Sequence, residues 1–501
     1  MRSRRYATAA AAIQIFVTLG SSSRVLLREG TIVSWDAVTE SVEVVRGGSL
    51  LITDDVITAI YKNGEEASDA VTAEDTEIID ATDMIITPGF IDTHRHGWQT
   101  AFRTIGSNTS LWEYFNRYGE FVTNSLFTPD DVYIGQLAGL YEALNAGVTT
   151  TLDHAHHTWS DLTAEAGLQA SADSGARVFW AYAFHEVEGY TIEQQMVNFK
   201  KLADADIVKG TPATLGIAYD GFDSAAAANV TEGLQELIRP CYLHVWAVLA
   251  DNSPETLHSL DILNISVPVV FSHASFISHT GYQLLRQTNQ YVSITPESEL
   301  HYGHGHPKSH LIQDQAALGV DTHFTFSTDI LTQARIWLQR VRARFYDAAL
   351  DRWQIPVNNP MSVNQAFLLS TRNGALSLRR PDLGIIAPGA KADIVVWNGR
   401  NPGLLGWADP VAAVILHASI ADIEHVLVDG KFKKRNGKLV VPEYEDVAAK
   451  FLESARRIQA QMKAIPLPVP SGLWQTGAEL VQTDIADVLR GDLTGYGRTF
   501  L

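Results

Sequence analysis

His94 and His96 are the residues of this chain best suited to chemistry, and they form a His-x-His pair. An apolar run, Met84 to Ile86, leads through Pro88-Gly89 into a short predicted strand that ends at this pair. Alternate side chains of a strand point to the same face, so the two imidazoles project together. Such a pair can take adjacent positions on one metal ion. In isolation, hydrogen-bonded histidines at a strand end would look the same, so the interpretation depends on the rest of the chain.

Further candidate ligands follow apolar segments later in the sequence. His244 ends the run that starts at Cys241, His273 ends Val269–His273, and Asp329 follows Phe324–Thr328. Three imidazoles and a carboxylate with one open position are what a site that activates water needs. Taken alone, His244 or His273 would be interpreted as a core histidine. Because Cys241 is the only cysteine, a cysteine-based zinc site and an intrachain disulfide are excluded.

Strand-like runs that alternate with helical stretches must position these residues. The predicted strands are Met84–His96, Val148–His154, Arg177–Phe184, Ala213–Tyr219, Pro240–Val245, Val267–His273, Tyr291–Thr295 and His323–Thr328. Eight β-then-α units predict a (β/α)8 barrel, whose typical length is about 250 residues. Such barrels place their chemistry at the carboxyl ends of the strands, where the candidate residues stand.

The two ends of the chain share a different pattern. Short, regularly spaced strands are predicted over Val25–Ile86, and the same texture returns after Lys391. We therefore expect an α/β protein in which both ends pair into one small β-sandwich beside a distorted TIM-like barrel. The predicted divisions are a signal or disordered extension (1–24), the N-terminal β-sandwich segment (25–86), the barrel (87–385), the C-terminal β-sandwich segment (386–443) and a C-terminal helical extension (444–501).

Composition narrows the function classes. The chain has 501 residues, of which 46% are hydrophobic and 19% charged, so it can bury a large core and is not disordered. Its net charge of −19 argues against nucleic acid or an anionic membrane as the main partner and favours a small molecule. Arg2, Arg4 and Arg5 precede an apolar run too short to span a bilayer. We expect a cytoplasmic protein, or a secreted one if residues 1–23 are a signal peptide.

Four segments taken together resemble the amidohydrolase superfamily, in particular the branch of cytosine deaminase, S-adenosylhomocysteine deaminase and the triazine hydrolases. They are PGFIDTHRH (88–96), GVTTTLD (147–153), FSTD (326–329) and PGAKADIVVW (388–397). The resemblance runs from about Val25 to Glu443. It implies one divalent metal ion per chain, zinc or alternatively iron or manganese, bound by His94, His96, His244 and Asp329.

The same resemblance implies catalytic roles. His273 would contact the activated water or polarise the bond under attack. Asp329 would take a proton from the water and pass it to the leaving group. No lysine follows the predicted strand Ala213–Tyr219, which argues against the binuclear version with a carboxylated lysine.

One departure from the family pattern concerns the acid that protonates the substrate. Family deaminases carry His-x-x-Glu after the fifth strand, whereas this chain has His244-Val245-Trp246-Ala247. We predict Glu297 as the replacement acid, although a carboxylate at a helix start is equally explained by the helix dipole. The predicted substrate contacts are Trp98, Gln99, His154 and His306, with a packing role as the alternative for Trp98.

The sequence thus predicts a metal-dependent hydrolase that cleaves a C–N bond (amide, cyclic amide or amine) in a small molecule. A homodimer is common in the family that it resembles. Two alternatives stay open. Ala247 is compatible with a lyase, decarboxylase or isomerase on the same scaffold, which would not incorporate solvent oxygen. The other alternative is a catalytically inactive binder of small molecules.

Overall fold

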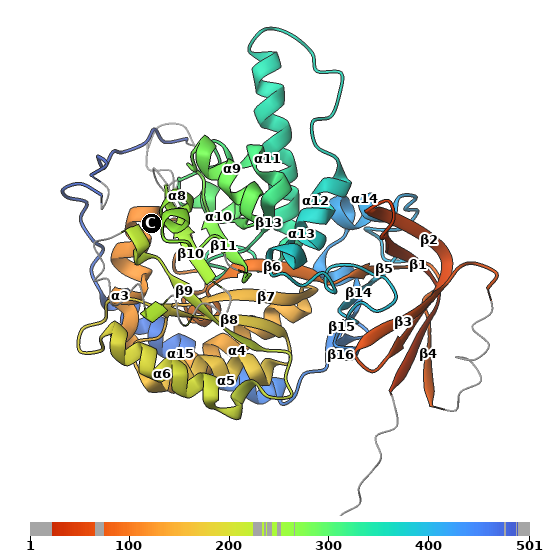
Figure 1. The fold of residues 1–501 in the computed structure, drawn as a ribbon, viewed down its shortest axis with the longest axis horizontal. Helices are drawn as coiled ribbons and strands as arrows, with labels where there is room; N and C mark the ends of the chain where they lie inside the picture. The colour runs from red at the N-terminus through yellow and green to blue at the C-terminus, as the bar shows by residue number, and fades with distance from the viewer. Residues whose placement is uncertain are drawn as a thin grey trace, which may run out of the picture.

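The computed structural model describes residues 23–65, 75–223, 233–234, 237, 243–247, 252–264, 266–474, 477–486 and 488. The apolar run of the predicted signal lies outside these residues. Within them, a mixed sheet at one end of the molecule adjoins a larger unit in which a parallel sheet is covered by helices (Figure 1). None of the described helices combines the length and apolar character that crossing a bilayer would require.

The mixed sheet is built from both ends of the chain. Its nine described strands are β1 (Arg24–Asp36), β2 (Ser41–Thr53), β3 (Val56–Tyr61), β4 (Thr76–Asp80), β5 (Met84–Pro88), β14 (Ile394–Asn398), β15 (Ile423–Val428), β16 (Lys431–Arg435) and β17 (Lys438–Leu439). Antiparallel pairing of β5 with β14 joins the two halves. The strands of the N-terminal segment are longer than predicted, since Gly30 and Gly48 pair with each other inside β1 and β2, flanked by register shifts. A glycine accommodates such a bulge without ending the strand.

The parallel sheet carries the candidate site. Its eight described strands follow one another in chain order: β6 (Phe90–Arg95), β7 (Val148–Ala155), β8 (Arg177–Phe184), β9 (Thr214–Tyr219), β10 (Leu243–Ala247), β11 (Val269–His273), β12 (Tyr291–Ile294) and β13 (Ala316–Leu318). The two edge strands meet, because the backbone N–H groups of Val320 and Asp321 donate to the carbonyl oxygen of His94 at 3.0 and 2.7 Å. A parallel bridge between Arg95 and Asp321 marks the same junction.

The last strand of this sheet is not where the sequence pattern placed it. His323–Thr328 forms turns, and β13 lies earlier, at Ala316–Leu318. Phe324 packs edge-on against Phe102 in an aromatic cluster instead of alternating along a strand. The sequence signal for β13 is weak, because the strand is short and two of its three residues are alanine, which has low strand propensity.

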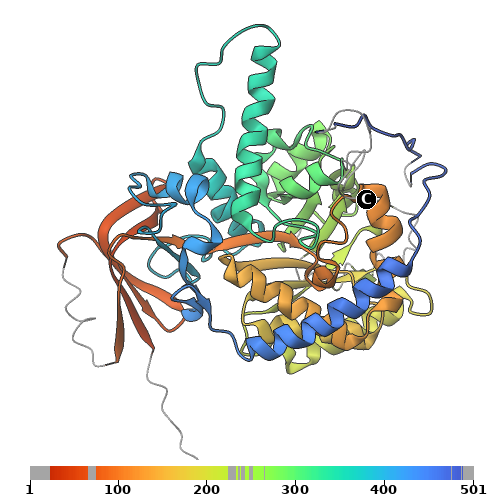
Figure 2. The same cartoon turned by 180° about the vertical axis from the view of Figure 1, so that it is seen from behind.

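Helices connect and cover the parallel strands, as parallel pairing requires. The main ones are α4 (Pro129–Asn145), α5 (Asp161–Ser174), α6 (Ile192–Asp204), α8 (Ser253–Ser259), α9 (His279–Thr288), α10 (Pro296–His301), α11 (Ile330–Leu350), α12 (Val363–Ser370) and α13 (Arg372–Ser377). Shorter helices are α2 (Leu111–Glu113), α3 (Glu120–Thr123) and α14 (Pro410–Ala412). The predicted C-terminal helix is α15 (Tyr444–Ala464), which lies across α4 at the back of the molecule (Figure 2).

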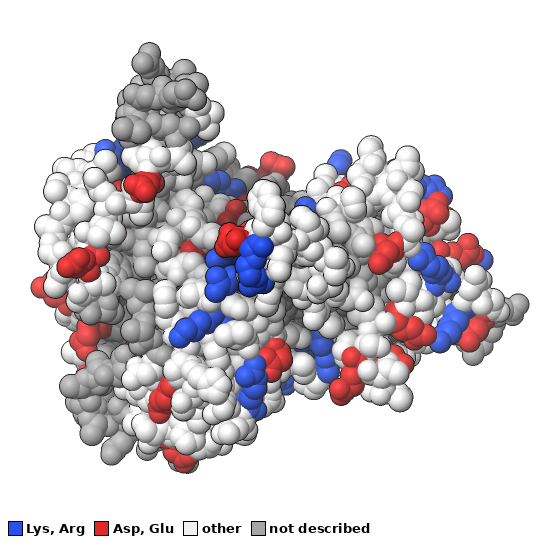
Figure 3. All heavy atoms as spheres, turned by 90° about the horizontal axis from the view of Figure 1, so that it is seen from above, with Lys and Arg blue, Asp and Glu red and all other residues white. Residues whose placement is uncertain are grey.

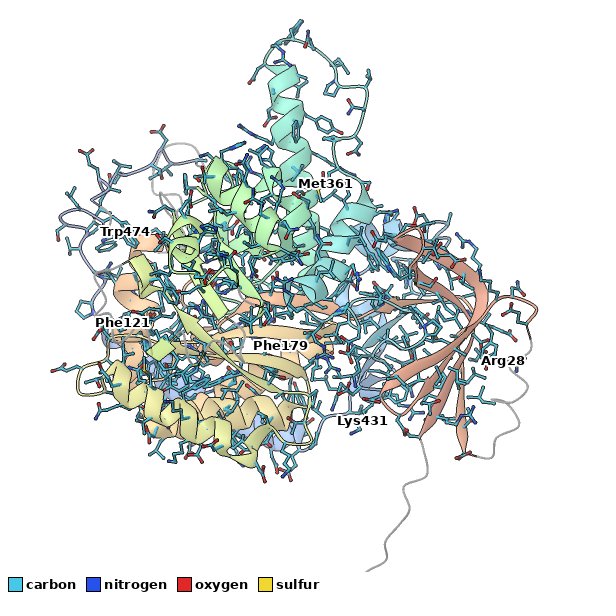
Figure 4. The ribbon with its side chains drawn as sticks, viewed as in Figure 1. Arg28, Phe121, Phe179, Met361, Lys431 and Trp474 are labelled. Atoms are coloured by element: carbon cyan, nitrogen blue, oxygen red, sulfur yellow. The ribbon has the colours of Figure 1, made fainter. Side chains whose placement is uncertain are left out.

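A buried apolar cluster lies between the strands that carry the site residues. Ile91, Leu152, Phe179 and Val270, from four strands of the parallel sheet, belong to one fully buried cluster. Figure 4 shows Phe179 in the interior of the unit, whereas Phe121 and Trp474 lie on the side away from the mixed sheet. Every residue of β7 and β8 is buried, as expected for parallel strands covered on both faces. The carboxyl ends of these strands are therefore held on a rigid base.

Candidate active site

His94 and His96 lie at the end of β6, buried and close together. Their ring centroids are 4.8 Å apart and the rings are nearly perpendicular. Nδ1 of His96 lies 3.0 Å from the carbonyl oxygen of His154 in β7. A carbonyl oxygen can only accept, so Nδ1 of His96 carries a proton and Nε2 is the nitrogen that faces the site. This is the arrangement by which proteins orient a metal-binding histidine.

Asp321 supplies the carboxylate of the site. Its Oδ1 lies 3.2 Å from Nε2 of His94 and 3.0 Å from Nε2 of His96, and its Oδ2 accepts a hydrogen bond from Ser298. Burial acts to raise the pKa of Asp321, but the two histidines outweigh it and lower the pKa well below its usual value. Burial lowers the pKa of His94 to about 4, which favours the neutral imidazole that a metal needs.

Asp329, the carboxylate predicted from the FSTD segment, lies elsewhere. It is the N-cap of α11, where its Oδ1 accepts from the backbone N–H of Thr332 at 2.6 Å and its Oδ2 from the hydroxyl at 2.9 Å. The structure brings Asp321, not Asp329, to the histidines. The shift follows from the misplaced last strand, since Asp321 is the acidic residue that follows β13. An acidic residue directly before an apolar helical segment is itself an N-cap signal.

His244 lies in β10, in register with Ala218 of β9 and Val270 of β11. Both neighbours belong to the buried cluster beneath the site. The side chain of His244 lies outside the described part of the chain, so its predicted metal contact stays a prediction. Cys241 lies outside the described residues altogether.

His273 ends β11 beside the histidine pair. Its ring centroid is 5.1 Å from that of His94, and its Nε2 is 4.0 Å from Oδ2 of Asp321. On the other side of the ring, Nδ1 lies 2.9 Å from Oγ1 of Thr295. The backbone of His273 has a φ of 65°, followed by 46° at Ala274. Left-handed backbone at non-glycine residues is strained and is concentrated at functional sites.

Glu297, the predicted replacement acid, does not join the histidines. Its Oε2 accepts from Ser327 Oγ at 2.6 Å and from Gln333 Nε2 at 2.9 Å, between α10 and α11. Burial raises its pKa. Glu299, two residues further along α10, is the carboxylate that reaches His273. Residues two apart on a helix face different directions, so only one of the two acids at the start of α10 can point to His273. The second acid, Glu299, was the available sequence signal for this role.

The four predicted substrate contacts lie near the site in different ways. Trp98 donates from Nε1 to Nδ1 of His156 at 3.0 Å and packs edge-on against Phe127 and Trp159. Gln99 is fully buried, and its amide nitrogen donates to Tyr114 and to a backbone carbonyl. The ring of His154 is 5.2 Å from that of His96, and Nε2 of His306 is 2.7 Å from Oε2 of Glu299. Arg103 pairs with Glu142 at the surface.

The donor set fits a divalent metal ion. Ligand atoms of His94, His96 and His154 lie within 4.8 Å of one another, as do those of His94, His273 and Asp321. All five residues are buried. Neutral imidazoles with one carboxylate suit zinc, iron or manganese.

Two relatives of known function are similar to this chain over most of its length. The 5-methylthioadenosine/S-adenosylhomocysteine deaminase of Pyrococcus horikoshii is 24% identical over 432 residues, covering 80% of this chain and 94% of the relative. A 5′-deoxyadenosine deaminase of Methanosarcina mazei is 24% identical over 439 residues, covering 84% and 95%.

Solved structures share the fold. An adenosine deaminase from Xanthomonas campestris with bound zinc superposes with a TM-score of 0.73 at 17% identity, covering 88% of this chain and 99% of that one. Atrazine chlorohydrolase from Arthrobacter aurescens TC1 with zinc gives 0.72 at 19% identity, covering 86% and 100%. Residues 85–433 match the sequence pattern of one family, and the predicted resemblance is thereby confirmed: the chain belongs to the amidohydrolase family.

Proposed function

We propose that this amidohydrolase uses a divalent metal ion and water to cleave a C–N bond of a small heterocyclic amine or cyclic amide. The observation that carries the proposal is the carboxylate of Asp321, which lies against Nε2 of both His94 and His96. The edge strands that meet at Arg95 and Asp321 support a closed, distorted barrel with this site at its mouth.

His94, His96, His244 and Asp321 would hold the metal, with zinc as the proposed ion. Asp321 thus takes the place that the sequence pattern had given to Asp329. When bound, the ion would supply Lewis-acid activation of water near neutral pH. A nitrogen-rich set with one carboxylate favours zinc over magnesium or calcium, which prefer oxygen ligands.

The protein's own groups then manage the proton and the substrate. Asp321 is buried and ionised, so it can accept a proton from water and return it to the departing nitrogen. Ser298 donates to Oδ2 of Asp321 and holds the carboxylate in place. Nε2 of His273 lies on the same side as Asp321 and would contact the atom under attack. Trp98 is buried and donates to His156, whose ring lies 4.1 Å from that of His96, so this side of the site would exclude bulk water.

The named relatives favour an amino-substituted heterocycle as substrate, since they are deaminases of adenosine derivatives. Ala247 stands where such deaminases carry a glutamate. We therefore expect a substrate whose leaving group departs without protonation of the ring by that carboxylate. Fold alone does not choose the substrate, because loops at the mouth of a barrel set specificity.

The test is turnover of the zinc-loaded full chain with adenosine, 5′-methylthioadenosine, 5′-deoxyadenosine, atrazine and a cyclic amide such as dihydrouracil. Reactions run in water enriched in oxygen-18, with product mass and the release of ammonia or amine measured; chloride release from atrazine would instead show cleavage of a C–Cl bond. One labelled oxygen per product, lost in Asp321→Asn, supports the proposal. Conversion without label would replace it by a lyase or isomerase, and no turnover of any compound by zinc-loaded protein would leave a small-molecule binder.

We also propose that the chain forms a homodimer through an arm made by the end of α11 and the following loop. The arm projects from the body (Figure 1), and Trp353, Ile355 and Val357 at its tip are 98%, 80% and 97% exposed. Residues 340–352 carry four arginines and two aspartates, although the chain as a whole has a charge of −19. Basic side chains gather over α11 amid scattered acidic ones (Figure 3). A second copy offers the acidic surface that complements this arm.

A further inference from the structure

His273 lies beside the position at which this chain lacks the expected glutamate. Ala247 of β10 is in register with His273 of β11. The family's proton-transferring carboxylate is therefore absent next to the histidine that would contact the substrate. Another carboxylate, that of Glu299, approaches the same histidine from α10.

Glu299 makes contacts through both carboxylate oxygens. Oε1 lies 3.2 Å from Nδ1 of His273 and accepts from the backbone N–H of Thr295 at 3.0 Å. Oε2 lies 2.7 Å from Nε2 of His306, whose ring stacks edge-on against Trp337 at 5.3 Å. Glu299 is completely buried. A buried carboxylate persists only with such partners, so the two imidazoles and Thr295 together stabilise this one in the interior.

The electrostatics agree with this arrangement. Burial acts to raise the pKa of Glu299, but His306 and His273 together outweigh it and lower the pKa below its ordinary value. An ionised carboxylate only accepts hydrogen bonds, and the hydroxyl of Thr295 donates to Oε1 of Glu299 at 3.2 Å. Both oxygen atoms near Nδ1 of His273 are then acceptors, so Nδ1 carries the proton. Nε2 of His273 then faces Asp321, with 4.0 Å between it and Oδ2.

We propose that Glu299 is a positioning residue that fixes the tautomer and ring orientation of His273, with His306 anchoring Glu299 from its other side. His273 has a left-handed backbone, and the contacts of Nδ1 with Glu299 and Thr295 restrain the rotation of its imidazole about the side-chain bonds. The chain thus lacks a carboxylate at Ala247, and the carboxylate of Glu299 acts on His273 rather than directly on the substrate. The catalytic consequence, though not the tautomer, rests on the proposed function.

The test compares Glu299→Ala and Glu299→Gln with the wild type, all loaded with zinc. Nitrogen-15 NMR of histidine-labelled protein reports the tautomer of His273, whose signals are assigned by their loss in His273→Gln. The matched control is Asp393→Asn, a buried carboxylate that pairs with Arg177 at the opposite end of β8. Zinc content is measured for each protein, and kcat and KM with the first compound of the panel that is hydrolysed.

We expect a single Nδ1-protonated tautomer in the wild type and in Asp393→Asn, and a mixture in Glu299→Ala with unchanged zinc. Loss of an orienting partner outside the metal ligands costs about 10–100-fold, so kcat should fall by this factor while KM stays within about threefold. Glu299→Gln keeps an acceptor oxygen and should recover most of kcat. If Glu299→Ala fails to fold, His306→Ala, which removes the contact on the other side of Glu299, should give a smaller shift of the tautomer and of kcat in the same direction.

An unchanged His273 tautomer in Glu299→Ala would overturn the proposal, as would a fall in kcat of Glu299→Ala no larger than that of Asp393→Asn. Failure of the proposed function would look different. It would appear as a wild type that holds no zinc or hydrolyses none of the panel, while the NMR comparison still decides whether Glu299 sets the tautomer.

Discussion

Replacing Asp321 and Asp329 separately by asparagine distinguishes the carboxylate at the histidines from the one that the FSTD segment suggested. Asp321→Asn keeps the shape of the side chain but removes the charge that lies 3.2 and 3.0 Å from the two imidazole nitrogens. Changing residues that only orient metal ligands costs about 10–100-fold in metal affinity. Loss of a direct ligand should therefore weaken zinc binding by at least about 100-fold. At a zinc concentration that saturates only the wild type, the free energy of unfolding of Asp321→Asn should be lower than that of the wild type by up to about 2.7 kcal/mol.

Asp329→Asn should behave differently because asparagine caps helices about as well as aspartate. Only the attraction between its charge and the dipole of α11 is lost, which is worth about 0.3–1 kcal/mol. Zinc affinity is measured by competition with a chromophoric chelator, and stability by thermal melts with and without zinc. Equal zinc affinity in wild type and Asp321→Asn, or a large loss in Asp329→Asn, would refute the assignment.

Three further changes test other parts of the molecule. Burial raises the pKa of Glu120 to about 7, so its ionisation lowers the stability of the wild type as the pH rises from about 4.5 to 7. Glu120→Gln should therefore be more stable than the wild type at pH 8, by at most about 3 kcal/mol, and should melt at the same temperature as the wild type near pH 4. In Gly319→Ala the new Cβ would lie 2.9 Å from the backbone nitrogen of His94, so β6 must shift, at a cost of about 1–3 kcal/mol with weaker zinc binding in titrations. Replacing Trp353 and Val357 by serine should reduce the mass measured by light scattering from twice 55.0 kDa to 55.0 kDa, whereas a wild-type monomer would exclude the proposed arm contact.

The fold was predictable where the local signal and the tertiary structure agree. β8 was predicted with its bounds, because Arg177–Phe184 is a continuous buried run with aromatic residues and valine. The sequence pattern also places the histidine pair at the end of a strand, but the predicted strand Met84–His96 is two strands, because Pro88-Gly89 separates β6 from β5 of the mixed sheet. The amphipathic pattern of α15 was clear from the sequence as well.

The carboxylates were harder to predict, because their positions depend on tertiary structure. Asp321 follows an alanine-rich strand with little intrinsic preference, whereas Asp329 follows aromatic residues that pack in a loop. Glu297 and Glu299 share one short helix, and only the direction in which α10 packs decides which of them is buried against His273. Sequence spacing specifies neither the start of the last strand nor the rotation of a helix about its axis.

Metal content of the full-length chain, purified without chelators and measured by plasma mass spectrometry, tests the proposed metal site most directly. We predict about one zinc, iron or manganese per chain, reduced to a small fraction in His94→Ala and in Asp321→Asn. Two ions per chain would show that His154 takes part in a second site. No bound metal, and none recovered after adding zinc to folded protein, would contradict a metal-dependent mechanism.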